Sequence, residues 1–406
     1  MDDSLYFTEH HHQVREMVRD FSRTHIAPVA AELDQTSTFP WENIKGMGEL
    51  GLLGVPWSEE LGGAGMDQLS YYITIHEMAK VDASHALTIS AHTNLGTSPI
   101  VEFGTEEQRQ RYVPLLASGR VLGGFGLTEP GAGSDAGGTA STAVDKGDHY
   151  LLNGSKIFIT HAGVGEIFSV TARTEPGRSG KGITSFIVTK DTVDIERCRK
   201  LGVGHAEDLP KTPGVRAGKM QHKMGWRASD TRELIFEDAI VPKENVLGQP
   251  GQGFVNFLKT LDAGRIGIAA LSLGIAEGAY EEALRYAGVR KQFGRPIGSF
   301  QLVQEKLARM LGNVTASLTM VAGLAERQQE GVYRDEDSAL AKMWISLRMR
   351  ETVALARELV GGNGITLAHD VARFHADAEA VYSYEGTHEI NALVVGRSIT
   401  GRSAFV

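Results

Sequence analysis

Near the end of the chain, the four residues from Tyr384 to Thr387 combine side chains that suit proton transfer. Glu385 is a single carboxylate followed by Gly386, and glycine lets the backbone approach a ligand closely or adopt a positive φ. Thr387 offers a hydroxyl that can bind a cofactor or cap a following helix. A carboxylate held on such a turn suits a general base that faces a buried substrate. The same residues also fit a capped surface turn, so the motif needs support from the rest of the chain.

The composition is that of a globular protein with more than one domain. The chain has 406 residues, 42% of them hydrophobic, which is enough for two or three domains with a substantial core. The net charge of −9 argues against a nucleic-acid or anionic-membrane partner. The start of the chain does not read as a signal peptide, and no apolar run approaches the ~18 residues that span a membrane. We expect a cytoplasmic protein with neither nucleic acid nor membrane as a partner.

Cysteine and histidine usage predicts neither a disulfide framework nor a metal site. Cys198 is the one cysteine, which fits a reducing compartment, and no neighbour in sequence would activate it as a nucleophile. The consecutive histidines His10 to His12 lie in an expected helix, where their side chains point in different directions. We therefore expect these histidines to be solvated, and we expect no bound metal.

Hydrophobic periodicity divides the chain into three parts. In residues 1–123, apolar side chains such as Val18 and Phe21 recur at helical spacing. Residues 124–245 instead carry short strand-like runs, and residues 246–406 return to helical spacing. We therefore expect an α+β protein with an N-terminal helical domain, a middle β-domain and a C-terminal four-helix bundle.

Two predictions concern the β-domain in detail. The pair Asn153-Gly154 separates strand-like runs over Tyr150–Leu152 and Ser155–Ile159, which is the strongest short signal for a hairpin. Residues 201–219 are polar and contain Gly and Pro, so we expect a loop there.

The C-terminal part has the regular spacing of packed helices. Apolar residues from Leu307 to Ala325 recur at alternating intervals of four and three, which is the pattern of a bundle seam. Leu340, Met343 and Leu347 begin a second inward face.

A segment rich in proline and glycine, Leu127 to Asp135 (LTEPGAGSD), presents backbone N–H groups and hydroxyls that suit a flavin or phosphates. Together with the order of domains and the motifs below, it resembles the acyl-CoA dehydrogenase family over nearly the whole chain. The resemblance implies that Thr128 hydrogen-bonds the flavin ring of FAD. It also implies that Phe125 and Leu127 contact this cofactor, and that Ser134 contacts the cofactor or the CoA arm.

The motif Phe158-Ile159-Thr160 is similar to a family strand that lies against the flavin. Many members carry Trp where this chain has Phe158, and phenylalanine still offers an apolar face. The resemblance implies that Phe158 packs on FAD and that the Thr160 hydroxyl lies near the reactive ring nitrogen.

Two later motifs imply a second subunit. Arg290, in the sequence RKQFG, matches an arginine that reaches the FAD pyrophosphate of a neighbouring subunit, where its guanidinium suits phosphate oxygens. The same resemblance makes Phe293 a cofactor contact. Gly361 and Gly362 match glycines beside the cofactor phosphates, although they also fit a plain helix stop. A homotetramer is implied, because these positions serve a neighbour's cofactor.

Asp262 and Arg265 are three residues apart and share one face of an expected helix. They match family residues that hold CoA, and a surface ion pair is the alternative reading. The resemblance also makes Tyr384 and Gly386 contacts of the substrate.

Glu385 matches the catalytic base of the family. Some members, such as isovaleryl-CoA dehydrogenases, carry the base on a helix instead, and Gly264 occupies that position here. Thr387 and Glu389 are implied contacts of FAD. The implied reaction removes the α-proton with Glu385 while hydride leaves the β-carbon for flavin N5, which gives an α,β-unsaturated acyl-CoA. Electron-transfer flavoprotein is the implied acceptor.

The tail from Glu379 to Gly401 most resembles glutaryl-CoA dehydrogenases, which bind a distal carboxylate with an arginine. Ala86 stands at that position here, and small residues such as Ala83 and Ser90 suggest a wide pocket. We expect a short, branched, cyclic or aryl-substituted acyl-CoA, for example the dicarboxylic thioester benzylsuccinyl-CoA. Glutaryl-CoA is the alternative substrate, while an acyl-CoA oxidase that uses O₂ and a non-catalytic scaffold are alternative functions.

Overall fold

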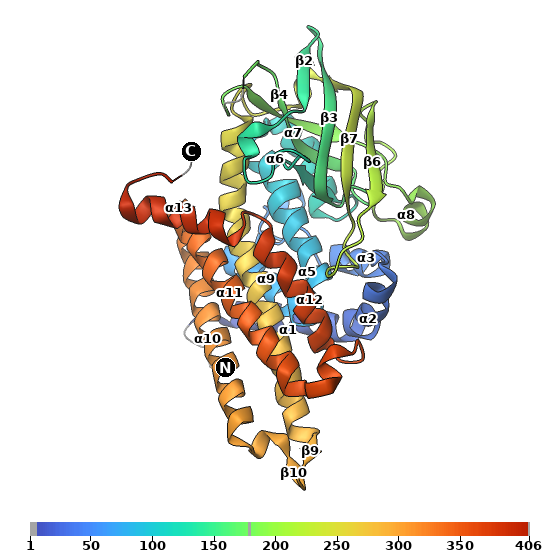
Figure 1. The fold of residues 1–406 in the computed structure, drawn as a ribbon. Helices are drawn as coiled ribbons and strands as arrows, with labels where there is room; N and C mark the ends of the chain where they lie inside the picture. The colour runs from blue at the N-terminus through green and yellow to red at the C-terminus, as the bar shows by residue number, and fades with distance from the viewer. Residues whose placement is uncertain (1–5, 178–179, 405–406) are drawn as a thin grey trace.

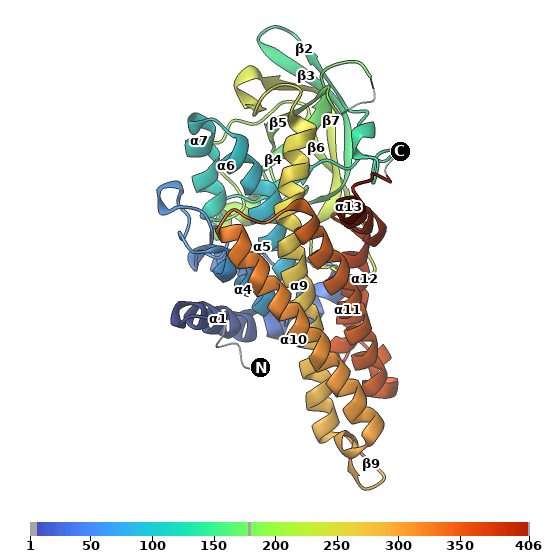
Figure 2. The same ribbon diagram turned by 90° about the vertical axis from the view of Figure 1, so that its left-hand side faces the viewer.

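The computed structural model of the chain describes residues 6–177 and 180–404. An eight-stranded sheet lies above two groups of helices, and the 37-residue helix α9 (Gly253–Val289) runs from the sheet to the opposite tip of the molecule (Figures 1 and 2). The predicted α+β fold, with a β-domain between two helical parts, is confirmed.

The N-terminal helices enclose α4 (Gln68–Ala79), a helix that is buried on all sides. Every side chain from Ser70 to Ala79 is buried, because α4 packs against α1, α5, α9 and α10. Asp67 caps this helix by accepting a 2.7 Å hydrogen bond from the Ser70 backbone N–H. The other helices of this part are α1 (Glu9–Phe21), α2 (Ala27–Thr36), α3 (Trp41–Glu49), α5 (Ala83–Ser90), α6 (Ser98–Phe103) and α7 (Glu106–Ala117), with π-helical turns η1 (Ser22–Ile26) and η3 (Ala91–Thr97).

The middle part forms one sheet with its strands in the order β6, β7, β3, β2, β4, β5 and β8, and β1 pairs in parallel with β4. Apolar side chains such as Phe168, Phe186 and Leu234 fill its core. The strands are β1 (Gly123–Gly126), β2 (Thr142–Asp145), β3 (His149–Thr160), β4 (Ile167–Arg173), β5 (Ile183–Thr189), β6 (Val215–Met220), β7 (Thr231–Pro242) and β8 (Val246–Leu247).

The predicted hairpin at Asn153-Gly154 is wrong, because β3 continues through both residues and pairs with β7 on either side of them. The register shifts between Leu152 and Gly154, which marks a bulge. A Cβ atom on Gly154 would lie 2.4 Å from the Ser141 Oγ atom. The glycine therefore permits close packing inside one strand and does not form a turn.

The loop expected over residues 201–219 is only partly correct. Helix α8 (Ile195–Leu201) precedes it, and strand β6 begins at Val215 and pairs with β7 at the edge of the sheet. An edge strand with one solvated face tolerates polar side chains, so composition alone hid this strand.

The C-terminal helices form the predicted bundle. Helices α9, α10 (Gln301–Gln329), α11 (Asp335–Val360) and α12 (Asp370–Ser383) pack together, and α13 (His388–Thr400) packs on α11. A small hairpin of β9 (Lys291–Gln292) and β10 (Arg295–Pro296) forms the lower tip in Figure 1. Gly361 ends α11 with a φ of 68°, as expected of a helix stop.

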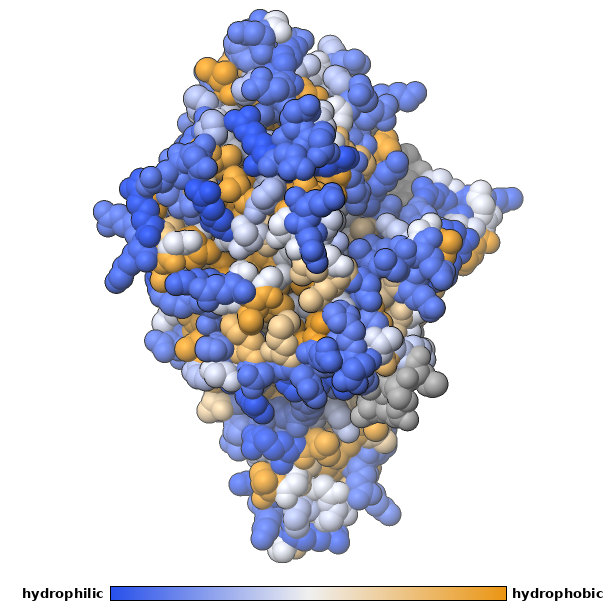
Figure 3. Space-filling view, turned by 180° about the vertical axis from the view of Figure 1, so that it is seen from behind, coloured by the Kyte–Doolittle hydropathy of each residue, from blue (hydrophilic) through white to orange (hydrophobic). Residues whose placement is uncertain are grey.

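Some apolar residues that were expected to face inward are exposed on this single chain. In α10, Val314 and Leu318 are buried, but Leu311 is 41% exposed. In α11, Leu340 and Leu347 are also exposed, so the predicted inward face of that helix is wrong for the isolated chain. Seen from behind, apolar side chains gather among hydrophilic ones across the middle of the molecule (Figure 3).

Helix α10 is the one helix in the described ranges that is long and apolar enough to cross a membrane by length and composition. This agrees poorly with our expectation that no apolar run approaches that length. The same test is passed by core helices of soluble proteins, and α10 packs against α9 and α11 in the bundle.

Candidate active site

The turn that carries Glu385 lies between α12 and α13 and has an unusual backbone. Glu385 has a φ of 50°, a conformation that residues other than glycine seldom adopt, and Gly386 follows with a φ of 82°. Such strain persists only where the surroundings impose it, and it is concentrated at functional sites. Thr387 begins α13, where its Oγ1 accepts a 3.2 Å hydrogen bond from the Ile390 N–H.

The Glu385 carboxylate is buried against α9. Its Oε2 atom has no hydrogen-bond partner within residues 6–177 and 180–404. It lies 2.8 Å from the position of a Cβ atom on Gly264, a position that is also 3.4 Å from Leu95. Burial raises the pKa of Glu385 to about 7, and the positive charges of Arg265 and Lys342 oppose that rise. This is the environment of a base that works near neutral pH.

Three polar side chains hold the turn by its backbone. Arg265 Nε donates to the carbonyl of Glu385 at 3.5 Å, and Lys342 Nζ donates to the carbonyl of Gly386 at 2.8 Å. Asn391 Nδ2 donates to that same Gly386 carbonyl at 2.9 Å. Because these donors bind carbonyl groups, they fix the turn and leave the Glu385 carboxylate free for a substrate.

Asp262 and Arg265 form an ion pair, with 2.6 Å between Oδ1 and Nη1, and this pair is not on the surface. Arg265 is only 6% exposed, and burial raises the pKa of Asp262 to about 6 although Arg265 lowers it. The alternative of a plain surface pair is therefore wrong, since Arg265 also supports the Glu385 turn.

Tyr384 joins the turn to the β-domain. Its ring packs edge-on against Trp226, with 4.8 Å between the ring centroids. The backbone N–H of Trp226 donates to Asp377 Oδ1 at 2.6 Å, and burial raises the pKa of this carboxyl to about 8. Sequence reasoning missed Lys342, Trp226 and Asp377, because their partners lie far away along the chain. The one local signal was Lys342 itself, a charged residue at a buried position of α11.

The segments expected to contact a flavin lie side by side. The Ile157 N–H donates to the Thr128 carbonyl at 2.8 Å, which places the segment after β1 beside the end of β3. Phe158 has a φ of 59° and is 64% exposed, while Thr128 and Thr160 are half-buried. An uncovered apolar ring beside two hydroxyls fits one face of an isoalloxazine ring. Phe125 is stacked on Phe257 in α9, with ring centroids 4.1 Å apart.

A buried ion pair supports this segment from behind. Lys156 Nζ lies 2.7 Å from Glu129 Oε1 and donates to the Leu127 carbonyl at 3.3 Å. Burial lowers the pKa of Lys156 to about 8. Burial alone would raise the pKa of Glu129, but the charge and hydrogen bond of Lys156, together with hydrogen bonds from Ser141 and Ala140, lower that pKa.

Turn η3 connects the flavin segment with the base. A Cβ atom on Gly96 would lie 2.6 Å from the Gly123 carbonyl carbon, so η3 packs tightly on β1. The neighbouring Leu95 reaches the space beside Gly264 and Glu385. Hence the structure brings the predicted base and the predicted flavin segment to opposite sides of one turn.

Other predicted site residues lie elsewhere. Arg290 directly precedes β9 and Phe293 lies between β9 and β10, the hairpin at the lower tip in Figure 1, and Phe293 is 92% exposed. Gly361 and Gly362 are exposed at the end of α11. This end lies beside the C-terminal end of α9, since the Asn363 side chain donates to the Tyr286 hydroxyl at 3.1 Å. The chain does not bring these residues to its own Glu385. Ser134 and Glu389 are exposed at the surface.

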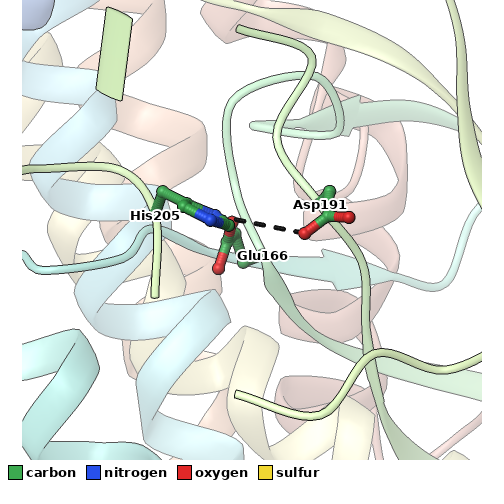
Figure 4. Close-up of side chains that lie close together, drawn as sticks. All are labelled: Glu166, Asp191 and His205. Atoms are coloured by element: carbon green, nitrogen blue, oxygen red, sulfur yellow. Dashed lines mark hydrogen bonds and ion pairs between the residues drawn. The ribbon is translucent and has the colours of Figure 1, made fainter. Parts of the chain in front are cut away.

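One cluster has the composition of a metal site, formed by Glu166, Asp191 and His205 (Figure 4). Lys211 Nζ lies 2.7 Å from Glu166 Oε2 and 3.5 Å from Asp191 Oδ1, so a lysine already supplies the positive charge there. His205 Nδ1 contacts the other oxygen of Glu166. We interpret the cluster as an ion-pair network that supports the β-domain.

The expected solvation of the three N-terminal histidines is wrong for His11. This side chain is buried, and its Nε2 atom lies 2.9 Å from Asp67 Oδ2. Cys198 is buried, and burial raises the pKa of its thiol to about 12, which disfavours the thiolate needed by a nucleophile.

Comparison with known proteins identifies the family. Three family profiles match the chain: the acyl-CoA dehydrogenase N-terminal domain over residues 8–120, the middle domain over 124–239 and the C-terminal domain over 251–400.

Individual relatives agree with these profiles. The chain is 43% identical to a short-chain-specific acyl-CoA dehydrogenase of Clostridium acetobutylicum, over 98% of this chain and 100% of that protein. It is 36% identical to the caffeyl-CoA reductase-Etf complex subunit CarC of Acetobacterium woodii, over 96% of this chain and 98% of that protein. The solved glutaryl-CoA dehydrogenase of Mycobacterium smegmatis superposes with a TM-score of 0.90 and 33% identity, over 100% of this chain and 98% of that one.

Enzymes of this family use FAD, and the residues found here fit that cofactor. The exposed Phe158 ring, the Thr128 and Thr160 hydroxyls and the nearby Glu385 carboxylate form the set that such a flavin site needs. The chain therefore belongs to the acyl-CoA dehydrogenase family and is an oxidoreductase of that family.

Proposed function

We propose that this protein oxidises a short acyl-CoA to its α,β-unsaturated thioester, with Glu385 as the base that removes the α-proton. The observation that carries the proposal is the Glu385 Oε2 atom, which is buried beside Gly264 and has no partner in the described part of the chain. Burial gives this carboxyl a pKa of about 7, so it can accept a proton near neutral pH.

The residues around Glu385 have distinct parts in this reaction. Arg265 and Lys342 hold the carbonyls of the turn, so the carboxylate keeps its direction when the substrate binds. Leu95, Tyr384 and Trp226 surround the turn with apolar surface that excludes water from the proton transfer. Bound FAD supplies the acceptor for the hydride that leaves the β-carbon.

We infer a short, branched, cyclic or aryl-substituted acyl group. Small residues at Gly264 and Gly267 leave α9 without side chains where it faces Glu385 and η3. The similarity to a short-chain-specific enzyme and to a caffeyl-CoA reductase subunit supports a compact or aryl-bearing substrate. A dicarboxylic thioester such as benzylsuccinyl-CoA belongs to the same proposal.

Glutaryl-CoA is the less favoured substrate. Binding its distal carboxylate calls for a cation inside the pocket. Arg265 and Lys342 are the two cations that act on Glu385, and both already bind backbone carbonyls. Ala86, at the expected arginine position, is fully buried.

We also propose a homotetramer that passes its electrons to an electron-transfer flavoprotein. Arg290, Phe293 and Gly361 are exposed far from the Glu385 turn of their own chain, as residues that complete a neighbour's site would be. Exposed apolar residues of α10 and α11, including Leu311 and Leu340, would be covered by such an assembly. The name of the caffeyl-CoA reductase-Etf complex subunit supports the flavoprotein partner.

The test is anaerobic bleaching of the flavin by a panel of acyl-CoA thioesters. Wild-type protein should be bleached by a short, branched or aryl-substituted member. Glu385→Gln should bleach at least about 100-fold more slowly, because it cannot accept the proton. Bleaching that survives in the variant would place the base elsewhere, and fast reoxidation of the reduced enzyme by O₂ would favour an oxidase.

A further inference from the structure

Beyond the Glu385 carboxylate, a second group of polar side chains faces α9. A Cβ atom on Gly267 would lie 2.6 Å from Asn94 Nδ2 and 3.1 Å from Ser90 Oγ. Gly264 and Gly267 are three residues apart in α9, so they share a face and are separated by about 4.5 Å along the axis. These polar groups therefore lie about one helical turn from the base.

Two members of this group are buried polar groups that lack partners. The side chain of Asn94 is 7% exposed and that of Tyr71 is fully buried. Neither Asn94 Nδ2 nor the Tyr71 hydroxyl has a hydrogen-bond partner among the residues that the structure describes. Leaving such a group unpaired costs about 1–3 kcal/mol, so a ligand that paired with these two groups would be stabilised.

Tyr71 lies within electrostatic reach of the base. Burial raises the pKa of the Tyr71 hydroxyl most, and the charges of Tyr72 and of the Glu385 carboxylate add to that rise. The Ser90 and Thr93 hydroxyls lie near Tyr71 and oppose that rise, but no hydrogen bond of normal distance and angle joins either of them to the Tyr71 hydroxyl. Thr93 donates its own hydroxyl proton to the Leu53 carbonyl at 3.2 Å. Tyr71 thus keeps its proton and is available as a donor.

The group is neutral, which limits what it can bind. Tyr71, Asn94 and Ser90 offer hydroxyl and amide groups without a formal charge. The cations nearest to Glu385, Arg265 and Lys342, are engaged with backbone carbonyls. A buried carboxylate would therefore lack a counter-charge here, whereas a neutral oxygen would be stabilised by the two donors.

We propose that Tyr71 and Asn94 form a polar subsite for the distal part of the acyl group, which binds a neutral oxygen carried beyond the β-carbon. A hydroxyl suits the subsite best, because it can donate as well as accept and so matches either orientation of the Asn94 amide. The inference rests on the proposed function, because the same pocket must hold the acyl group of a thioester.

Matched substrate pairs test this subsite. In each pair a terminal hydroxyl replaces a terminal methyl group of nearly equal size: 4-hydroxybutyryl-CoA against pentanoyl-CoA, and 5-hydroxypentanoyl-CoA against hexanoyl-CoA. The measured quantity is kcat/KM for anaerobic reduction of the bound flavin. Wild-type protein should prefer the hydroxyl member of at least one pair about tenfold or more, since one net neutral hydrogen bond is worth about that factor.

Two variants and one control locate the effect. Tyr71→Phe and Asn94→Leu remove the polar groups and keep most of the volume, so each should lower the hydroxyl preference about tenfold. Tyr72→Phe is the matched control, because Tyr72 is the buried neighbour on α4 and its hydroxyl contacts Gln328 in α10. This control should keep the wild-type preference, whatever it does to stability.

The outcomes separate this inference from the proposed function. If both alkyl thioesters reduce the flavin and are preferred to their hydroxyl partners, ordered water satisfies the donors and the polar subsite is wrong. An unchanged hydroxyl preference in both variants would also overturn it. If butyryl-CoA and every other thioester of the panel fail to reduce the flavin, the proposed function itself has failed.

Discussion

The Oε2 atom of Glu385 lies 2.8 Å from the position that a Cβ atom on Gly264 would occupy. A side chain on α9 at this position would therefore push the Glu385 carboxylate aside. The carboxylate gains a buried, unbonded oxygen, and burial raises its pKa to about 7. The absence of a side chain at Gly264 thus leaves room for the carboxylate in this buried position.

Gly264→Ala should impair catalysis without loss of stability. The added Cβ displaces the Glu385 carboxylate, and a misplacement of about 1 Å costs about 100-fold in rate. Alanine should favour the helix by up to about 1 kcal/mol. The matched control is Gly288→Ala in the same helix, where a Cβ would meet no atom within 4 Å. Flavin-reduction rates and thermal unfolding measure both effects, and full activity of Gly264→Ala would contradict the placement of Glu385.

The rate of flavin reduction should rise with pH through about 7. Glu385 acts as a base only when it is ionised, and burial keeps its carboxyl protonated below that pH. Because the folded pKa is raised, any contribution of this group to stability is present below its ordinary pKa and is lost as the pH rises through about 7. Single-turnover rates of flavin reduction between pH 5 and 9 measure the pH at which the rate rises. A rise of the rate near pH 4 would mean that the Glu385 carboxylate is solvated.

Lys342→Met should move the pH-dependent rise of the flavin-reduction rate to higher pH. The positive charge of Lys342 favours the ionised form of Glu385, so its removal raises the pKa of the carboxyl further. Lys306→Met is the control, since Lys306 pairs with Glu358 on the exposed side of the bundle. A profile that stays in place in Lys342→Met would show that the two charges do not interact. The same stopped-flow series measures both variants.

The buried pair of Glu129 and Lys156 should control retention of FAD. Lys156→Met leaves the Glu129 carboxylate without its cation, which should cost about 3–5 kcal/mol in the free energy of unfolding and release flavin at a lower temperature. The double variant Glu129→Gln/Lys156→Met should recover much of this loss, because no unpaired charge remains. Arg216→Ala, which breaks an exposed pair, should leave the unfolding temperature nearly unchanged. Equal losses in the single and double variants would contradict this account.

Mixed oligomers should show whether two chains build one site. If Arg290 completes the cofactor site of a neighbour, co-assembly of Arg290→Gln with Glu385→Gln chains should restore activity that neither variant has alone. Sites that combine Glu385 of one chain with Arg290 of another are then complete. Assay of the co-purified mixture against each variant measures this complementation. No recovery despite proven co-assembly would rule out shared sites.

The sequence by itself determined the order of the helical and β parts and made Glu385 the candidate base. Helical and strand periodicities are local properties, so they survive without knowledge of the fold. The motifs around Thr128, Phe158 and Glu385 each span only a few consecutive residues. They could therefore be recognised in the sequence without knowledge of the fold.

Only the tertiary structure decided what surrounds the base and which faces are buried. Lys342 reaches Gly386, Trp226 reaches Tyr384, and Asn94 approaches Gly267, across separations that no local pattern records. The Asn153-Gly154 pair carries a turn signal, but pairing with β7 on both sides stabilises a continuous strand. Long-range hydrogen bonds and packing override local propensity there, and the same long-range contacts give Glu385 its dry environment and raised pKa.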